Sequence, residues 1–442
     1  MKFFKRMAMG TFAVSMSVML AACGGNEPTS DTPADPETDT DSGEEAAVDD
    51  DEVVTITYAR GFDATEGNTK LVEAFMEQNP NIKVEFQEMP ADTGAQHDSY
   101  VTAFSAQSAE IDVFDVDVIW PAEFAQANYA LELDRFIDQD GIDMDAYFPG
   151  TVQSGNVGGK QFAMPKFTDA GLLYYRSDII DTPPATWDEL IEMASAHQGE
   201  EGTQFGYLMQ ANQYEGLVVN ATEFIAAYGG EVINENGEVV INSPEAIKGI
   251  EKMAEIATSD FVPGDILSFM ETETANSFIQ GNAVFARNWP YMQSMANDEA
   301  NSDVAGNVDF ALLPAGDAGS AAGLGGWMTM ISRYSENIEA SWELVKFMTG
   351  PEGQKITAMY GGNAPTIEAL YEDAEVQEVS PLFANEEFVS TLQNAVPRPI
   401  TPIYPEISDI MQIELSSVLA GSITAEEAVA NMEEKMNAAI NN

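Results

Sequence analysis

Apolar and polar residues recur with two distinct periods along much of the chain, and these periods predict the elements of a mixed α/β fold. Runs rich in β-branched residues, or with alternating apolar positions, predict strands at 53–58, 82–86 and 111–118. Apolar residues that gather on one helical face predict helices at 69–79 and 100–108. A chain in which strands and helices alternate in this way is expected to form a mostly parallel sheet with helices on its faces.

Capping patterns predict further helices later in the chain. Thr186 precedes a helix that carries Glu189 at its third position, which is the arrangement of a capping box. Ser243 precedes a proline, the residue favoured at the first position of a helix. Because ligands bind beyond the carboxyl ends of strands in open α/β sheets, residues 61–66 and 117–120 are candidate binding segments.

The charge of the chain excludes several classes of function. Its 442 residues include 74 acidic and 18 basic side chains, which give a formal net charge of −56. Binding of nucleic acid depends on a basic surface, so no nucleic-acid partner is expected. So large a surplus of one sign is self-repelling unless salt screens it, which suggests a halophilic or alkaliphilic working environment. One cysteine and two histidines provide no pattern for an internal disulfide, a metal site or a cofactor, and none is expected.

The first 52 residues have the pattern of an exported and anchored protein. Residues 1–22 combine basic residues with an apolar run too short for a membrane span, as in a secretory signal peptide. The run ends in L-A-A-C-G, which resembles a bacterial lipoprotein box and implies lipidation of Cys23. A plain signal peptide with an incidental cysteine is the alternative. Residues 23–52 are acidic and predict a disordered tether, so we expect an extracytoplasmic protein anchored to the membrane.

Aromatic residues lie beside carboxylates and arginines in several segments, a combination typical of sugar binding. Aromatic rings cover the apolar C–H faces of a sugar, and charged groups form strong hydrogen bonds with its hydroxyls. The segments are 168–176, 213–216, 288–291 and 325–327. A further candidate is Arg398, which stands between two prolines in N-A-V-P-R-P-I-T-P-I-Y-P (394–405). The prolines restrict the backbone, which favours a side chain that is ordered before a ligand binds.

Several segments together resemble the family 1 extracellular solute-binding proteins, which are the sugar-binding subunits of ABC importers. The matching segments are 165–176, 183–190, 281–291, 325–327 and 396–405. Within the family, the chain is similar to the trehalose/maltose-binding branch through residues 115–120, 213–217 and 288–291. The resemblance implies a two-lobed α/β fold with three crossovers and a central ligand cleft that closes by a hinge motion. It also implies a binding protein and not an enzyme.

The resemblance further implies where the lobes begin and end. The crossovers are expected near residues 166–169, Pro314 and Gly350. The N-terminal lobe would comprise 53–167 with 314–351, and the C-terminal lobe would comprise 168–313 with 352–442.

Roles for single residues also follow from the resemblance. Carboxylates would accept hydrogen bonds from sugar hydroxyls, aromatic rings would stack on the sugar, and Arg398 would donate a forked pair of hydrogen bonds. The implied acceptors are Glu66, Asp117 and Asp169, the stacking groups are Trp289 and Trp327 with Gly326, and the rim residues are Tyr214 and Glu215. Two positions depart from the family pattern: Phe167 replaces a frequent tyrosine, and only His97 stands near the place of a sugar-binding arginine. These departures concern the identity of the sugar.

The sequence therefore predicts a monomeric, lipid-anchored receptor that captures a glucose disaccharide and delivers it to an ABC permease. Another oligosaccharide is an open alternative for the ligand. A second hypothesis is a glycoside hydrolase that uses two of Glu66, Asp117 and Asp169, because suitably spaced carboxylates permit that chemistry. A third is a sensor or adhesin with the same fold.

Overall fold

The computed structural model describes residues 53–62, 65–234 and 236–441. The predicted signal peptide at 1–22, the predicted lipidation site Cys23 and the predicted tether at 23–52 lie outside the described residues. Within the described part, no helix is both long enough and apolar enough to cross a membrane.

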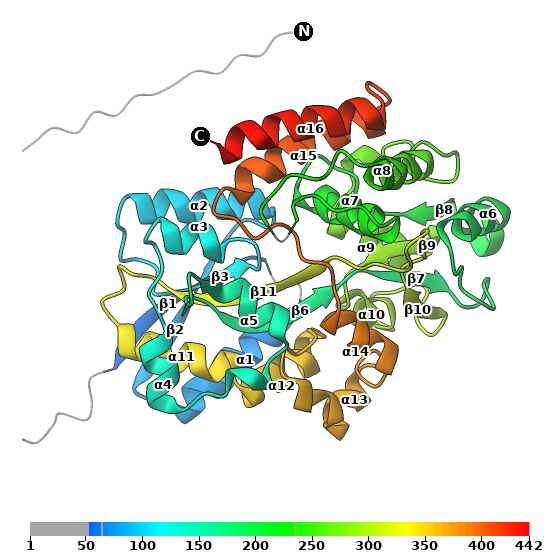
Figure 1. Cartoon of the computed structure of the whole chain (residues 1–442). Coiled ribbons are helices and arrows are strands. Elements are labelled where there is room, and N and C mark those ends of the chain that lie inside the picture. The colour runs from blue at the N-terminus through cyan, green and yellow to red at the C-terminus, as the bar shows by residue number, and fades with distance from the viewer. Residues whose placement is uncertain (1–52, 63–64, 235, 442) are drawn as a thin grey trace, which may run out of the picture. The chain divides into compact units, whose positions relative to one another are not determined.

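A five-stranded sheet forms one half of the described structure (Figure 1). Its strands lie in the order β2-β1-β3-β11-β6. Their bounds are β1 Val54–Arg60, β2 Ile82–Glu88, β3 Val113–Asp117, β6 Met164–Ala170 and β11 Leu324–Ile331. Strand β1 pairs in parallel with β2 and β3, whereas β11 is antiparallel to β3 and β6. The β2-β1-β3 part confirms the predicted alternation of strands and helices. The expectation of a mostly parallel sheet is wrong for the sheet as a whole, because β11 and β6 come from later in the chain and add antiparallel pairs.

Different helices cover the two faces of this sheet. They are α1 (Gly67–Gln78), α2 (Thr93–Ser105), α3 (Pro121–Gln126) and α11 (Ile338–Thr349). Helices α1 and α11 share a buried apolar cluster with Ile56 and Tyr58 of β1. Helices α2 and α3 share a separate cluster with Ala59. Successive side chains of a strand point to opposite faces, so the two clusters lie on opposite sides of the sheet.

A four-stranded sheet forms the other half, with the order β10-β7-β9-β8. Its strands are β7 Leu172–Arg176, β8 Phe205–Leu208, β9 Ala283–Asn288 and β10 Val308–Leu312. Only β8 and β9 are parallel among these pairs. The surrounding helices include α6 Trp187–His197, α7 Glu215–Ala227, α8 Pro244–Ala257, α9 Glu271–Ile279, α15 Tyr404–Leu419 and α16 Ala425–Ile440. One large apolar cluster joins this sheet to its helices.

The two predicted N-caps are confirmed, but the predicted capping box at Thr186 forms only in part, because Oε2 of Glu189 accepts from the N–H of Ala185 at 2.7 Å and not from that of Thr186. The hydroxyl of Thr186 accepts a hydrogen bond from the backbone N–H of Glu189 at 3.2 Å and starts α6. The hydroxyl of Ser243 accepts a hydrogen bond from the backbone N–H of Ala246 at 3.2 Å and starts α8. Such caps satisfy N–H groups that have no partner inside the helix, so short sequence patterns locate these two starts well.

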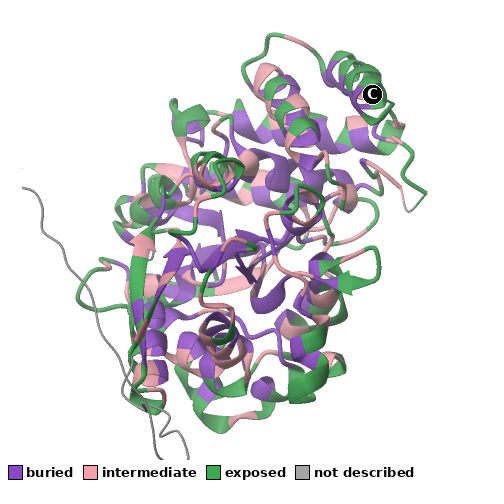
Figure 2. Cartoon of the chain, turned by 90° about the vertical axis from the view of Figure 1, so that its left-hand side faces the viewer, coloured by how far each residue is buried: buried purple, intermediate pink, exposed green. Residues whose placement is uncertain are grey.

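Shorter elements complete the described chain. They are α4 Asp134–Asp140, η1 Met144–Ala146, α5 Pro149–Gly155, β4 Asn156–Val157, β5 Lys160–Gln161, η2 Glu200–Gly202, η3 Ile266–Ser268, α10 Met292–Ala296, α12 Pro351–Gly361, η4 Glu368–Glu372, α13 Ala374–Val379 and α14 Glu386–Gln393. Figure 2 shows buried residues along the central strands and exposed residues on the outer helical surfaces. Both sheets are therefore covered, and polar side chains within them need partners.

Two connections carry the chain between the sheets. Strand β6 ends in the first sheet, and β7 begins in the second sheet after Gly171 alone. A Cβ atom at Gly171 would lie 2.2 Å from Oε1 of Glu223, so any side chain here would displace that buried carboxylate. The chain returns between Leu312, the end of β10, and Leu324, the start of β11. The predicted lobe boundaries, including the crossover near Gly350, remain a proposal.

Candidate functional site

The proline-rich segment 394–405, which contains Arg398, lies along the second connection between the sheets. The backbone N–H of Val396 donates to the carbonyl of Ala322 at 2.8 Å, and the N–H of Leu324 donates to the carbonyl of Val396 at 2.8 Å. Two residues later, Arg398 is only 3% exposed. The ring of Pro397 fixes φ at that residue, which restrains the backbone that leads to Arg398. The arginine is thus held where the two sheets meet.

Arg398 joins carboxylates that come from different halves of the molecule. Its Nη2 donates to Oδ1 of Asp117, the last residue of β3, at 2.9 Å. Its Nη1 donates to Oε1 of Glu215, the first residue of α7, at 2.6 Å. Nη2 also lies 3.4 Å from the carbonyl oxygen of Leu324. The buried Nε has no hydrogen-bond partner among the described residues. The forked donor predicted for a sugar therefore contacts two protein carboxylates in this structure.

The charges in this cluster affect one another. Burial raises the pKa of Asp117, the Arg398 guanidinium lowers it and Glu215 raises it, so that the net direction is upward. Burial alone would lower the pKa of Arg398, but the carboxylates of Asp117 and Glu215 outweigh it and raise the pKa, so the arginine stays charged. Glu215 also accepts hydrogen bonds from the hydroxyl of Tyr404 at 2.6 Å and from that of Ser408. Glu215 is therefore firmly fixed.

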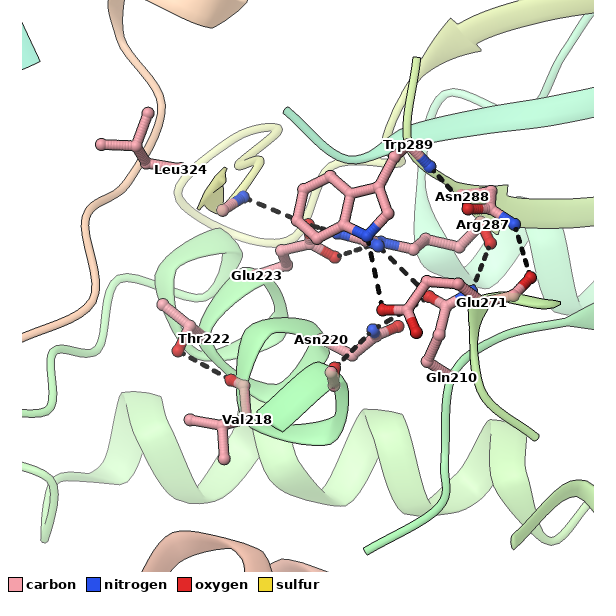
Figure 3. Close-up of polar contacts among 12 residues, drawn as sticks. Gln210, Val218, Asn220, Thr222, Glu223, Glu271, Arg287, Asn288, Trp289 and Leu324 are labelled. Carbon is pink, nitrogen blue, oxygen red and sulfur yellow. Dashed lines mark hydrogen bonds and ion pairs between the residues drawn. The ribbon is translucent and has the colours of Figure 1, made fainter. Parts of the chain in front are cut away.

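Trp289 extends from the end of β9 toward the first sheet. A Cβ atom at Gly325 in β11 would lie 2.9 Å from Cζ3 of the Trp289 ring. The guanidinium carbon of Arg287 is 4.0 Å from the centroid of that ring, which is a cation–π contact. The indole Nε1 donates to Oε1 of Glu271 at 3.4 Å. Figure 3 shows the indole beside Arg287, with Glu271 at its N–H edge.

Asp169 stands opposite Gly325 in the pairing of β6 with β11. A Cβ atom at Gly325 would also lie 3.2 Å from Cβ of Asp169, so this carboxylate is close to the Trp289 ring. The side chain is half-buried. Burial raises its pKa to about 7, while Arg287 lowers it and Asp117 raises it. Asp169 consequently titrates near neutral pH.

The glycine-tryptophan pair of β11 adjoins Asp117. Trp327 stands opposite Asp117 in the pairing of β11 with β3. Its half-buried ring makes an edge contact with Trp120, with centroids 5.6 Å apart. Gly326 has φ +118°, and a Cβ atom there would lie 2.4 Å from the carbonyl oxygen of Phe167. Only glycine fits this position.

Two further predicted residues have different surroundings. Tyr214 is 7% exposed, and its hydroxyl donates to Oε2 of Glu271 at 2.7 Å. Glu66 is an exposed residue just before α1, and its carbonyl oxygen accepts from the N–H of Lys70 at 2.9 Å. The structure thus brings Asp117, Glu215 and Arg398 into one cluster. It gives Glu66 no contact with them.

His97 is the one basic residue near the place where the resemblance expects a sugar-binding arginine. Its Nε2 lies 2.7 Å from Oε2 of Glu123, and its ring meets the edge of Trp120 at 5.5 Å between centroids. Burial lowers the pKa of His97, but the carboxylates of Glu123 and Asp98 have the larger combined effect and raise it, so the net shift is upward. The His97 ring thus contacts Trp120, and Trp120 in turn contacts Trp327.

Residues 63–355 match the family of bacterial extracellular solute-binding proteins. The chain belongs to this family. A curated relative from Deinococcus radiodurans, described as a probable ABC transporter-binding protein, is 34% identical over 399 residues. That match covers 86% of this chain and 92% of the relative.

Solved structures agree with this membership. Maltose-bound MalE3 of T. maritima is 38% identical to this solute-binding protein, with a TM-score of 0.82. The match covers 87% of this chain and 99% of that chain. A solute-binding protein of Thermotoga lettingae bound with α-D-tagatose is 25% identical, with a TM-score of 0.78 over 87% of this chain and 99% of that chain. The predicted family and the two-lobed α/β fold are confirmed, and the family consists of binding proteins of ABC transporters, not of enzymes.

Three residues of this solute-binding protein that support Trp289 were missed in the sequence. They are Glu223, Glu271 and Arg287. Arg287 forms a buried ion pair with Glu223, with Nη2 2.5 Å from Oε1 and Nε 3.1 Å from Oε2. The one available signal was an arginine inside the apolar strand A-V-F-A-R-N, because a buried arginine requires a carboxylate partner. The sequence contains no indication of which carboxylate that is.

The residues around Arg398 and Trp289 together offer hydrogen-bond donors, acceptors and aromatic faces. Within residues 53–62, 65–234 and 236–441, no group of three or more histidine, cysteine, aspartate or glutamate side chains is arranged to hold a metal ion. The chemistry that this arrangement supports is recognition of a polar, hydroxylated ligand.

Proposed function

We propose that this solute-binding protein captures a glucose disaccharide of the trehalose or maltose type by closure of its lobes. The observation that carries the proposal is the Asp117–Arg398–Glu215 cluster, which joins residues from both halves of the fold beside two tryptophans. The similarity to a maltose-bound structure at 38% identity supports the choice of ligand. We further propose that the protein is monomeric, anchored through a lipidated Cys23, and delivers the sugar to an ABC permease.

The proposed ligand suits the groups that are present. Carboxylates such as Asp117 and Asp169 accept hydrogen bonds from sugar hydroxyls, and Arg398 supplies donors. The Trp289 indole has one face against Arg287, so its other face can cover the C–H face of a sugar ring. Glu66 is retained as an acceptor in this proposal through the family resemblance alone.

Relatives with other ligands define the alternative. One relative is a maltotriose-binding protein of Pyrococcus abyssi, 23% identical, and another is a galactooligosaccharide-binding protein of Bacillus subtilis, also 23% identical. A longer oligosaccharide is therefore the second candidate. Phe167 and His97, which differ from the expected tyrosine and arginine, are the positions that would alter specificity.

The test is isothermal titration calorimetry of the processed protein with trehalose, maltose, sucrose, glucose, maltotriose and a galactooligosaccharide, at high and low salt. We expect the tightest binding to trehalose or maltose and much weaker binding to glucose. Tightest binding to a trisaccharide would overturn the disaccharide assignment, and no heat with any sugar at either salt would overturn the whole proposal. Sustained release of glucose from either disaccharide would show hydrolysis in place of binding.

A further inference from the structure

Glu271, the first residue of α9, contacts two aromatic residues from different parts of the chain. Its Oε2 accepts from the hydroxyl of Tyr214 at 2.7 Å, and its Oε1 accepts from Nε1 of Trp289 at 3.4 Å. Its carbonyl oxygen accepts from Nδ2 of Asn288 at 3.3 Å, which attaches the start of the helix to the end of β9. One carboxylate thereby links the residue before α7 to the residue after β9.

Other parts of the Trp289 ring are in contact with protein groups as well. Arg287 covers one face at 4.0 Å, and it is held by Glu223 at 2.5 Å and by Oε1 of Gln210 at 3.2 Å. Gly325 lies against the benzo part of the ring, where a Cβ atom would be 2.9 Å from Cζ3. Figure 3 shows Glu271 near the pyrrole edge, where the N–H leaves the ring. These contacts fix the rotation of the indole, and the ring remains partly exposed and so accessible to a ligand.

We propose that Glu271 is a positioning residue for ligand binding. Its carboxylate sets the orientation of the Trp289 indole and of the Tyr214 phenol, so that the remaining indole face is presented to the sugar ring. This inference rests on the proposed function, because the ligand of the indole face is the sugar named there. An ordered ring loses less conformational freedom when the ligand arrives, which is the source of the gain in affinity.

A carboxylate suits this role for a chemical reason. Trp289 can only donate from its ring nitrogen, and a carboxylate accepts through two oxygens at once. A glutamine could keep both contacts, since its carbonyl oxygen can accept from the indole while its amide donates to the Tyr214 hydroxyl oxygen. An alanine keeps neither contact. Comparing Glu271→Gln with Glu271→Ala therefore separates hydrogen-bonded positioning from charge.

The first measurement follows the indole directly. The chain has five tryptophans, and the Nε1–H signal of Trp289 in a ¹H–¹⁵N spectrum is the one lost in Trp289→Phe. We expect this signal to shift and to exchange faster with solvent in Glu271→Ala, and to change much less in Glu271→Gln. Glu251→Ala, which removes one exposed carboxylate from α8, is the matched control and should leave the signal in place. An unchanged Trp289 signal in Glu271→Ala would overturn the inference whether or not any sugar binds.

The second measurement is the affinity of the same variants for the preferred disaccharide. Loss of one well-oriented aromatic contact is expected to weaken binding by about 5- to 10-fold in Glu271→Ala, with Glu271→Gln and Glu251→Ala close to the unsubstituted protein. Equal weakening in Glu271→Gln and Glu271→Ala would overturn the inference, since charge would then matter and not the two hydrogen bonds. If the unsubstituted protein binds no sugar, the proposed function fails, and the indole signal still reports separately on the positioning contact.

Discussion

Arg287 and Arg398 are both buried and both paired with carboxylates, but they stand in different places relative to the two sheets. Arg287 lies within β9, and its partners Glu223 and Gln210 belong to the same half of the fold. Arg398 lies in irregular backbone and bonds to Asp117 at the end of the first sheet and to a helix packed on the second. The first arginine consolidates one lobe, whereas the second connects two.

The two guanidinium groups also differ in how completely their N–H groups are hydrogen-bonded. Nε, Nη1 and Nη2 of Arg287 all donate to protein oxygens. The Nε of Arg398 has no partner among the described residues, although it is buried. Removing one partner of a fully hydrogen-bonded buried ion pair lowers stability, because the other charge is left without compensation. An incompletely satisfied group between the two halves of the fold is better suited to respond to a ligand. The comparison can be tested by substituting each arginine.

The largest expected effect is that of Arg287→Ala on stability. Burial raises the pKa of Glu223 and Arg287 lowers it, so the substitution leaves Glu223 as a buried acid that must protonate or remain unpaired. We expect the free energy of unfolding, measured with urea, to fall by about 3–5 kcal/mol. The double variant Arg287→Met with Glu223→Leu removes both charges and should recover much of this loss. A single variant that unfolds at the same urea concentration as the unsubstituted protein would contradict a structural role for the pair.

Arg398→Ala is expected to affect binding much more than stability. The substitution removes the donor shared by Asp117 and Glu215, and these two carboxylates then repel each other. Calorimetry should show a loss of disaccharide affinity of about 100-fold or more, the size expected for a buried charged hydrogen-bond partner. The free energy of unfolding should fall less than in Arg287→Ala. If the two variants show the same ratio of affinity loss to stability loss, the distinction between the arginines is wrong.

The sequence predicted the elements of this fold better than the contacts between them. Caps such as Thr186 act over three residues, so a local pattern suffices to locate them. Arg398 bonds to partners 183 and 281 residues away, and only the family resemblance named all three residues. Glu271 remained unnoticed, because nothing local distinguishes it from other acids in so acidic a chain. Its role depends on tertiary structure that brings two aromatic residues to one carboxylate.

Asp169 lies under the influence of both ion-paired clusters, because Arg287 lowers its pKa and Asp117 raises it, while burial has the largest effect and raises it to about 7. In the unfolded chain the pKa of an aspartate is about 3.9, so between these two values the folded protein binds more protons than the unfolded chain. The free energy of unfolding contributed by this residue therefore falls as pH rises from about 4 to about 7.

Asp169→Asn removes this titration and gives the smallest of the expected effects. The variant should be as stable as the unsubstituted protein near pH 4 and more stable by about 1–2 kcal/mol at pH 8, a range reduced because the side chain is only half-buried. Sugar affinity of the unsubstituted protein should rise between pH 6 and pH 8, since an ionised carboxylate is the stronger acceptor, while that of the variant stays flat. Calorimetry and urea unfolding at four pH values check both curves. A stability difference that does not vary with pH would show that Asp169 is already ionised when folded, and that its neighbouring arginine outweighs burial.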